Sequence, residues 1–361
     1  MVGKRYVAAI GALGVALALT ACGSSDDNAS GGSSTAASKG KIGVILPDTK
    51  SSARWESSDR PALEKAFKDA GIPAVIDNAQ GDATKMQTIA DQMLTQGVTV
   101  LAIVNLDSDS GAAIEAKAKK QGVATIDYDR LTLGGSADYY VSFDNSKVGT
   151  LQGEALAKCL GDKPANIVYL NGSPTDNNAT LFAAGAHKVL DAKTEYKQVA
   201  EQAVPKWDNL QAGTIFEQMF TQQKGKIDGV LAANDGLGNA AIAILKKNHL
   251  EGKVPVTGQD ATVQGLQNVL DGSQCMTVYK SAKEEVGALA DLAIAITKGQ
   301  KGTTTGTVHD DTGNRDVPSV LLDPKSITAD SVKDVVSDGG ASAAEVCTGA
   351  YAELCTKYGV S

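Results

Sequence analysis

Short β-branched runs alternate with amphipathic segments from Lys41 onward. Five apolar runs begin at residues 41, 73, 99, 123 and 139, and five more begin at residues 166, 196, 227, 254 and 274. Segments with the period of a helix lie between them, such as 60–71, 147–160 and 285–299. Strand and helix in alternation give parallel sheets that are covered by helices on both faces. The two series therefore predict an α/β protein with two doubly wound parallel sheets.

Polar residues follow many of these apolar runs. They are Asp48, Asn105, Asp129, Arg130, Asn171, Asn234, Asp235, Asp260 and Lys280. Ligands of open parallel sheets bind beyond the carboxyl ends of the strands, so these side chains are candidates for one binding cleft. Asn and Asp also favour turns and helix N-caps, and any one of them could be a cap. Capping does not explain Arg130 or Lys280.

The first 22 residues are typical of a bacterial lipoprotein signal. Lys4 and Arg5 precede an apolar stretch from Tyr6 to Leu19, which is shorter than the about 20 residues that a membrane-spanning helix needs. Leu-Thr-Ala-Cys at residues 19–22 then forms a lipobox. We expect cleavage after residue 21 and attachment of lipid to Cys22, which would anchor the protein to the outer face of the cytoplasmic membrane.

The segment that follows Cys22 predicts a flexible linker over residues 22–40. It is rich in Gly, Ser and Ala and has no large apolar residue, so it cannot bury enough surface to fold. Beyond it, no second apolar run approaches the length of a membrane span. The net charge is −8 and no Lys/Arg stripe is present, which argues against nucleic-acid binding.

The common catalytic and cofactor motifs are absent from this sequence. It has no GxSxG or HExxH motif, and its three histidines are isolated on polar stretches. The segment 236–241 fits GxGxxA, but Asn234 and Asp235 separate it from the preceding strand, so a close-packed helix start explains it better than dinucleotide binding. We expect no metal and no cofactor. The many carboxylates leave a secreted glycosidase open as an alternative.

Several segments resemble the periplasmic-type sugar-binding proteins of ABC importers, and most of all the D-xylose-binding branch. The matching segments are 54-RWESSDR, 127-DYDR, 139-YYVSFDNSKVG, 172-GSPTDNNATLFAAG, 204-VPKW, 233-AND, 258-GQDA and 276-MTVYK. They extend from about Lys41 to Pro324. The resemblance implies a type I periplasmic binding protein fold, a monosaccharide ligand (D-xylose first) and a permease partner.

The resemblance also implies a role for particular residues. Side chains that would hold the sugar hydroxyls are Arg54, Asp129, Arg130, Asn177 or Asn178, Asn234, Asp260 and Lys280. Trp55 and Trp207, the two tryptophans of the chain, would cover the faces of the sugar ring. Charged groups suit the hydroxyls on the rim of a pyranose, and aromatic rings suit its C–H faces.

Capture of the ligand by hinge closure is the mechanism that this family implies. The N-terminal lobe would comprise residues 41–142 and 282–323, and the C-terminal lobe 143–281 and 324–361. Chain crossings are expected near Ser142–Asp144, Lys280–Ser281 and Leu322–Pro324. The protein would be a monomer and no enzyme; presentation of sugar to a sensor kinase or chemoreceptor is a further possibility.

Four cysteines remain after Cys22, and an even number in an exported chain favours two disulfides. In the expected fold, the end of helix 147–160 and the start of strand 274–280 lie at the same pole, which favours Cys159–Cys275. Cys347 and Cys355 could then form a local bridge if Thr348-Gly349 breaks the helix between them. Four buried free thiols are the alternative.

Overall fold

The structure is a computed structural model that describes residues 40–161 and 163–361. The predicted signal peptide, the lipid site Cys22 and the linker lie outside the described residues, apart from Gly40. Within the described ranges, no helix is both long and apolar enough to cross a membrane.

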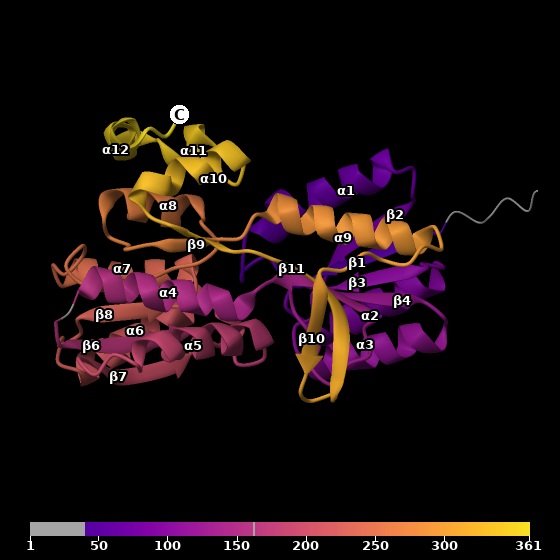
Figure 1. The fold of residues 1–361 in the computed structure, drawn as a ribbon, viewed down its shortest axis with the longest axis horizontal. Helices are drawn as coiled ribbons and strands as arrows, with labels where there is room; N and C mark the ends of the chain where they lie inside the picture. The colour runs from indigo at the N-terminus through magenta and orange to yellow at the C-terminus, as the bar shows by residue number, and fades with distance from the viewer. Residues whose placement is uncertain (1–39, 162) are drawn as a thin grey trace, which may run out of the picture. The chain divides into compact units, whose positions relative to one another are not determined.

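The first sheet has seven strands in the order β10-β11-β5-β4-β3-β1-β2 (Figure 1). Their bounds are β1 Ile42–Leu46, β2 Ala74–Asn78, β3 Val100–Ile103, β4 Ala124–Tyr128, β5 Tyr139–Phe143, β10 Gly306–Asp310 and β11 Arg315–Leu322. All neighbours are parallel except β10 and β11, which form an antiparallel hairpin. The strand order reverses at β1, so a ligand crevice is expected at the carboxyl ends of β1 and its neighbours.

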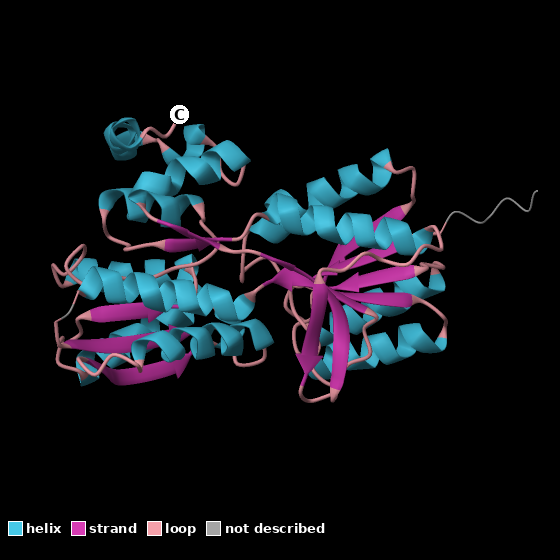
Figure 2. Ribbon diagram, in the orientation of Figure 1, coloured by secondary structure: helices cyan, strands magenta, loops and turns pink. Residues whose placement is uncertain are grey.

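Helices cover both faces of the first sheet (Figure 2). On one face, α1 (Arg60–Asp69) and α9 (Ala282–Thr297) pack against Val44 and Ala102. On the other face, α2 (Ala83–Thr95) and α3 (Ser108–Lys120) pack against Ile45 and Ile103. Every residue of β1 is buried, which is why its sequence IGVIL is uninterrupted by polar residues.

The second sheet has the order β7-β6-β8, with all neighbours parallel. Its strands are β6 Ala165–Asn171, β7 Tyr196–Ala203 and β8 Gly229–Ala232. One face packs against α4 (Asn145–Leu160) and α5 (Asn177–Leu190), and the other packs against α6 (Asn209–Gln222) and α7 (Asp235–Lys247). The order repeats that of β2-β1-β3, so both sheets present a reversal point at their carboxyl ends.

The expectation of five parallel strands in the second sheet is wrong for its last two runs. The run that begins at residue 254 forms only an isolated bridge, between Val230 and Val256. Pro255 has no N–H to extend the pairing on one side, and on the other side the Thr257 hydroxyl binds the backbone N–H and carbonyl of Ala232. The run that begins at residue 274 gives β9 (Thr277–Tyr279), which pairs antiparallel with β12 (Lys325–Ile327). The β10–β11 hairpin, which extends the first sheet, was not predicted either.

A C-terminal segment packs beside α8 (Val263–Asp271), as Figure 1 shows. Its helices are α10 (Val332–Asp338), α11 (Ala343–Val346) and α12 (Ala352–Tyr358). Leu266 of α8, Tyr279 of β9 and Val335 of α10 belong to one buried cluster. This cluster joins the C-terminal segment to the strand that leads to Lys280.

The structure pairs the four cysteines as Cys159–Cys275 and Cys347–Cys355. Their Cα atoms are 6.5 Å and 5.7 Å apart, which is within the usual range for a disulfide. The first bridge ties the end of α4 to the segment before β9. The second is possible because α11 ends at Val346 and α12 starts at Ala352, so no continuous helix separates the two cysteines.

The chain passes between the elements of the two sheets at three places. These are residues 143–145 between β5 and α4, residues 279–282 between β9 and α9, and residues 322–325 between β11 and β12. All three lie where crossings were expected. The exact limits of the two lobes remain a prediction.

Close packing of α4 against α5 depends on Gly149 and Gly185. A Cβ atom on Gly149 would overlap the carbonyl oxygen of Phe182, and one on Gly185 would overlap that of Ser146. The two helices therefore approach at backbone distance. This contact fixes the first turn of α5, which carries Asn178.

We expect Gly149→Ala to destabilise the protein by about 1–3 kcal/mol, because the added methyl group forces α4 and α5 apart. Gly213→Ala is the matched control, since Gly213 is also helical and has open space around its Cβ position. That change should be neutral or stabilising, because Ala is the better helix former. Urea unfolding of both variants measures the difference; equal midpoints would contradict the proposed packing role.

Candidate ligand-binding site

A small cavity, with a volume of about 30 Å³, lies at the carboxyl ends of strands from both sheets. Its lining residues come from the segments that follow β1, β4, β6, β7 and β8, including the first turns of α5, and from the segments around residues 259 and 280. They are Ser51, Ser52, Arg54, Trp55, Asp129, Arg130, Asp176, Asn178, Phe182, Trp207, Asn234, Gln259, Asp260 and Lys280. Nine of the ten residues predicted to bind ligand are in this set. Asn177, at the first position of α5, is not.

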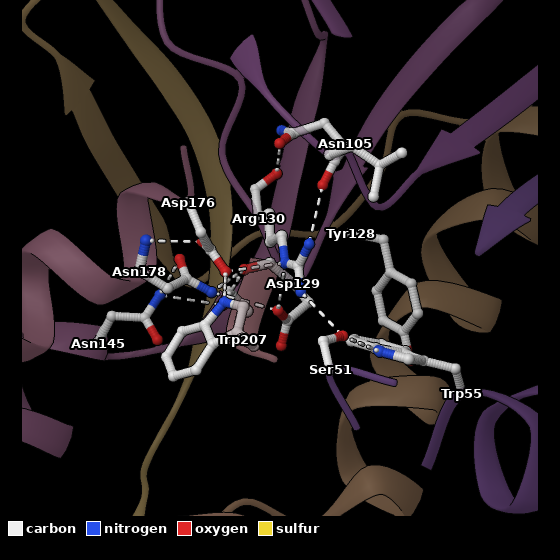
Figure 3. A network of polar contacts seen from close by, with 12 residues as sticks. Ser51, Trp55, Asn105, Tyr128, Asp129, Arg130, Asn145, Asp176, Asn178 and Trp207 are labelled. Carbon is white, nitrogen blue, oxygen red and sulfur yellow. Dashed lines mark hydrogen bonds and ion pairs between the residues drawn. The ribbon is translucent and has the colours of Figure 1, made fainter. Parts of the chain in front are cut away.

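Asp129 lies at the centre of the site, directly after β4 (Figure 3). Its backbone is left-handed, with a φ of 61°, and its carbonyl oxygen accepts hydrogen bonds from Tyr140, Ser142 and Asn178. Asn178 also donates to the carboxylate, at 3.2 Å. These bonds hold a conformation that costs free energy in isolation, so the position of the Asp129 carboxylate is set by both sheets.

Three cations surround the Asp129 carboxylate. Lys280 Nζ lies 3.5 Å and Arg54 Nη1 3.7 Å from its Oδ2 atom, and Arg130 Nε lies 4.0 Å from Oδ1. Burial alone would raise the pKa of Asp129, but the charges of Lys280, Arg54 and Arg130 outweigh it and lower that pKa. Asp129 is therefore an ionised hydrogen-bond acceptor at neutral pH.

Arg130 connects the first sheet to the start of α5. Its Nε atom is 3.0 Å from Asp176 Oδ2, and its Nη1 atom donates to the carbonyl of Asn105. Asp176 also accepts a hydrogen bond from the indole N–H of Trp207. Asp176 caps α5 as well, because its carboxylate accepts from the backbone N–H of Asn178. One carboxylate thus fixes an arginine, an aromatic ring and a helix start.

Arg54 is held by two buried acids outside the cavity. Its guanidinium donates to both oxygens of Asp59 and, at 2.6 Å, to Glu285 Oε2. Its Nη1 atom is buried and has no hydrogen-bond partner among the described residues. Because Arg54 lines the cavity, this free N–H group is available to a ligand oxygen.

Asp260 and Lys280 form the opposite side of the cavity. Asp260 has a left-handed backbone, with a φ of 95°, and burial raises the pKa of its carboxyl group. Burial alone would lower the pKa of the Lys280 ammonium group, but the charges of Asp129 and Asp260 outweigh this effect and raise that pKa. Asp235 supports the Asp260 loop, since its carboxylate accepts from the backbone N–H and the hydroxyl of Thr262.

The two tryptophans are buried and present their rings to the same cavity. Trp55 opens the π-helical turn η1 (Trp55–Asp59), and Arg54 lies 4.6 Å from its ring centroid. Trp207 has a left-handed backbone, with a φ of 55°, and packs so closely on Gly172 that any side chain there would overlap its ring. The strained backbone and the glycine together place the Trp207 ring.

Asn234 both caps a helix and lines the cavity. Its side-chain oxygen accepts from the backbone N–H of Leu237 at the start of α7, which leaves its amide N–H groups free for the site. Gly238 lies in the same first turns, where a Cβ would come within 3.0 Å of the Thr257 carbonyl oxygen. The glycines at 236 and 238 therefore fit a close-packed helix start.

Sequence reasoning did not select Ser51, Ser52, Asp176, Phe182 and Gln259 as site residues. Asp176 and Phe182 lie inside the quoted segment 172-GSPTDNNATLFAAG, and Gln259 lies inside 258-GQDA. Because Asp176 and Phe182 flank Asn178 and Gln259 directly precedes Asp260, their positions in the sequence could have identified them as site residues. No sequence signal pointed to Ser51. Its position depends on the conformation of its loop, in which the Ser51 hydroxyl accepts a hydrogen bond from the indole N–H of Trp55.

No histidine lines the cavity, and the described residues contain no group of three or more His, Cys, Asp or Glu side chains that could hold a metal ion. His187, one of the three histidines on polar stretches, lies away from the cavity. Its ring is half-buried, stacks on Tyr169 at 4.3 Å and faces Asp191 and Glu201. The site itself offers hydrogen-bond donors, acceptors and aromatic faces.

Residues 42–301 match the periplasmic binding protein domain family. The chain is 35% identical to the D-xylose-binding periplasmic protein of Escherichia coli, over 83% of this chain and 90% of that protein. It is 32% identical to a multiple sugar-binding periplasmic receptor of Rhizobium radiobacter, over 84% and 91% of the two chains. This chain belongs to the periplasmic binding protein family.

A solved structure confirms the predicted type I fold. It is an ABC transporter solute-binding protein from Clostridium phytofermentans with bound β-D-glucose. The TM-score is 0.78 at 29% identity, and the match covers 85% of this chain and 99% of that one.

Glu285 should make the stability of the protein depend on pH. Burial raises the pKa of its carboxyl group from 4.5 to about 8. A carboxyl group that binds its proton more tightly in the folded chain contributes stability below pH 4.5, and this is lost as the pH rises towards about 8. We expect Glu285→Gln to flatten this decline.

The measurement is thermal unfolding of the protein between pH 4.5 and 8.5. Glu284→Gln is the control, because Glu284 is exposed on the same helix turn. A part of the decline should remain in both variants, since burial also raises the pKa of Asp235 to about 7. Identical pH profiles for the wild type and Glu285→Gln would contradict the argument.

Proposed function

We propose that this protein binds a monosaccharide, with D-xylose as its ligand, and delivers it to the permease of an ABC importer. The observation that carries the proposal is the small cavity in which charged groups and two indole rings converge from both sheets. Its lining combines charged side chains, amides and aromatic rings, which suits the hydroxyls and C–H faces of one sugar ring. The named relatives from Escherichia coli and Rhizobium radiobacter support a sugar, and the former supports xylose.

The polar groups of the cavity match the chemistry of a pyranose. Asp129 and Asp260 would accept hydrogen bonds from ring hydroxyls, while Arg54 Nη1, Lys280 and the Asn234 amide would donate to their oxygens. Hydrogen bonds to charged groups are each worth roughly 1.5–3 kcal/mol, so a few of them select one arrangement of hydroxyls. Trp55 and Trp207 would contact the C–H faces of the ring.

The contacts between the two sheets suggest how the ligand is held. We infer that residues 41–142 with 282–323 and residues 143–281 with 324–361 rotate as lobes about the three crossings. The bonds Asn178–Asp129 and Arg130–Asp176 span these two parts of the chain. Both would form on closure, so a bound sugar would be enclosed by side chains that also join the lobes.

The site of action would be outside the cytoplasmic membrane. The lipobox at residues 19–22 supports a lipid anchor on Cys22, and the Gly/Ser-rich segment to residue 40 supports a tether long enough for the binding domain to reach a permease. Labelling with a radioactive fatty acid in cells tests this; a Cys22→Ala variant should lose both the label and the membrane association.

The alternative to a sugar-binding function is a secreted glycosidase, which the opposite pKa shifts of two cavity carboxyl groups favour. The pKa of Asp129 is lowered while that of Asp260 is raised, and glycosidases use two carboxyl groups with such opposite shifts. Against it, Asp129 is paired with Lys280 and Arg54, which suits binding. Release of nitrophenol from nitrophenyl xylosides by the protein would support the glycosidase.

D-xylose should bind the protein with a stoichiometry of one and micromolar or tighter affinity, about −8 kcal/mol or better. Isothermal titration calorimetry with D-xylose, D-glucose, D-ribose and xylobiose measures this. Binding of a hexose with no heat from xylose would reject xylose and retain the sugar-binding function. No heat from any sugar would reject both.

Asp260→Asn should weaken xylose binding by about 10–100-fold, because it removes the charge of a cavity acceptor while keeping its shape. Asn also tolerates the left-handed backbone at this position. Asp291→Asn, on the exposed side of α9, is the control and should bind as the wild type does. Wild-type affinity in Asp260→Asn would show that this carboxylate does not contact the ligand.

A further inference from the structure

Asp338, the last residue of α10, reaches from the C-terminal segment to the chain crossing at Lys280. Its Oδ2 atom accepts a hydrogen bond from the Tyr279 hydroxyl at 2.7 Å and another from the Ser281 hydroxyl at 2.8 Å. Tyr279 and Ser281 are the two neighbours of Lys280 in the chain. A single carboxylate oxygen therefore binds the side chains of both chain neighbours of the lysine that lines the cavity.

The same contact extends to Arg54 through α9. Ser281 is the N-cap of this helix, and its hydroxyl oxygen accepts from the backbone N–H of Glu284. The next residue is Glu285, whose Oε2 atom accepts a hydrogen bond from Arg54. Because the Ser281 hydroxyl donates its hydrogen bond to Asp338, the lone pairs of that oxygen can accept the N–H group that caps α9. The positions of two cavity cations thus depend on residues that Asp338 contacts.

Asp338 is itself held in place by packing. Val335, one turn earlier in α10, lies in the same buried cluster as Ile327, Tyr279 and Cys355. Gly340 lies so close to the Tyr279 ring that a Cβ there would come within 2.6 Å of its hydroxyl oxygen. The Cys347–Cys355 disulfide closes the segment that completes this cluster. Asp338 is therefore a fixed anchor for the crossing.

Asp338 lies outside the cavity lining, and its partners Tyr279 and Ser281 do so too. Its side chain is half-buried, whereas Asp334 on the same helix is exposed and makes no hydrogen bond or ion pair that the described structure contains. The bond from Tyr279 lowers the pKa of Asp338, and the bond from Ser281 adds to this. The carboxylate stays charged over the neutral range.

We propose that Asp338 is a positioning residue for ligand binding, which sets the affinity of the site by fixing Lys280 and the first turn of α9. The inference rests on the proposed sugar-binding function. It assigns to the C-terminal segment a part in binding without any contact to the ligand.

The test compares xylose affinity and ligand-free thermal stability across a set of variants of the whole protein. Asp338→Ala should raise the Kd for xylose by roughly tenfold, because two hydrogen bonds to a charged group are lost. Asp338→Asn should stay near the wild type, since an amide oxygen can still accept from both hydroxyls. Asp334→Ala, the matched control on α10, should leave the Kd unchanged.

A double-mutant cycle separates positioning from general destabilisation. In a protein that carries both Tyr279→Phe and Ser281→Ala, adding Asp338→Ala should cause no further rise in Kd, because its partners are already absent. Tyr279→Phe by itself should raise the Kd severalfold. The Kd of Tyr279→Phe therefore tests the contact even if Asp338→Ala does not fold.

Two outcomes would overturn the inference. They are a wild-type Kd in Asp338→Ala, whether or not its thermal stability falls, and a Kd change that adds in full to that of Tyr279→Phe and Ser281→Ala. A wild-type protein that binds no sugar at all would instead reject the proposed function, so the two failures are distinguishable.

Discussion

The structure of the site depends on one buried carboxylate, that of Asp129. A buried carboxylate is costly unless it is paired and hydrogen-bonded, and here the partners come from every part of the cavity wall. Arg54 and Arg130 belong to elements of the first sheet, while Asn178 starts α5 and Lys280 lies at a chain crossing. The charged form of Asp129 is stabilised by all of these groups, so it depends on the two sheets being close together. A ligand hydroxyl would donate its hydrogen bond to the Asp129 carboxylate, which is already ionised before the ligand binds.

Two of the cavity cations are oriented by acids, of which two lie outside the cavity lining and one belongs to it. Asp59 and Glu285 hold Arg54, and Asp176 holds Arg130. This arrangement restricts the rotamers of long side chains before a ligand arrives, so less conformational entropy is lost on binding. The cost appears elsewhere, because burial leaves Glu285 with a raised pKa.

Strained backbone and capping residues serve the same end. Asp129, Trp207 and Asp260 all have positive φ angles, and each presents a side chain to the cavity. Neighbouring hydrogen bonds hold these conformations, as those of Asp235 to Thr262 do beside Asp260. Asp176 and Asn234 cap helices with one oxygen and still line the cavity. At these two positions, one residue can therefore both cap a helix and face the cavity.

Much of this architecture could be predicted from local pattern. Uninterrupted apolar runs such as 42–46 indicate strands buried on both faces, and several of the polar residues that follow such runs, Asp129 and Asn234 among them, line the cavity. The same reasoning failed where pairing depends on individual groups, since Pro255 and the Thr257 hydroxyl limit a strand that periodicity predicts. Which acid holds which cation was decided only by the tertiary structure. Arg54 meets Glu285, 231 residues further on, and Asp338 reaches Ser281 across 57 residues. No periodic signal encodes such pairs, because they form only when sheets, crossings and the C-terminal segment have packed.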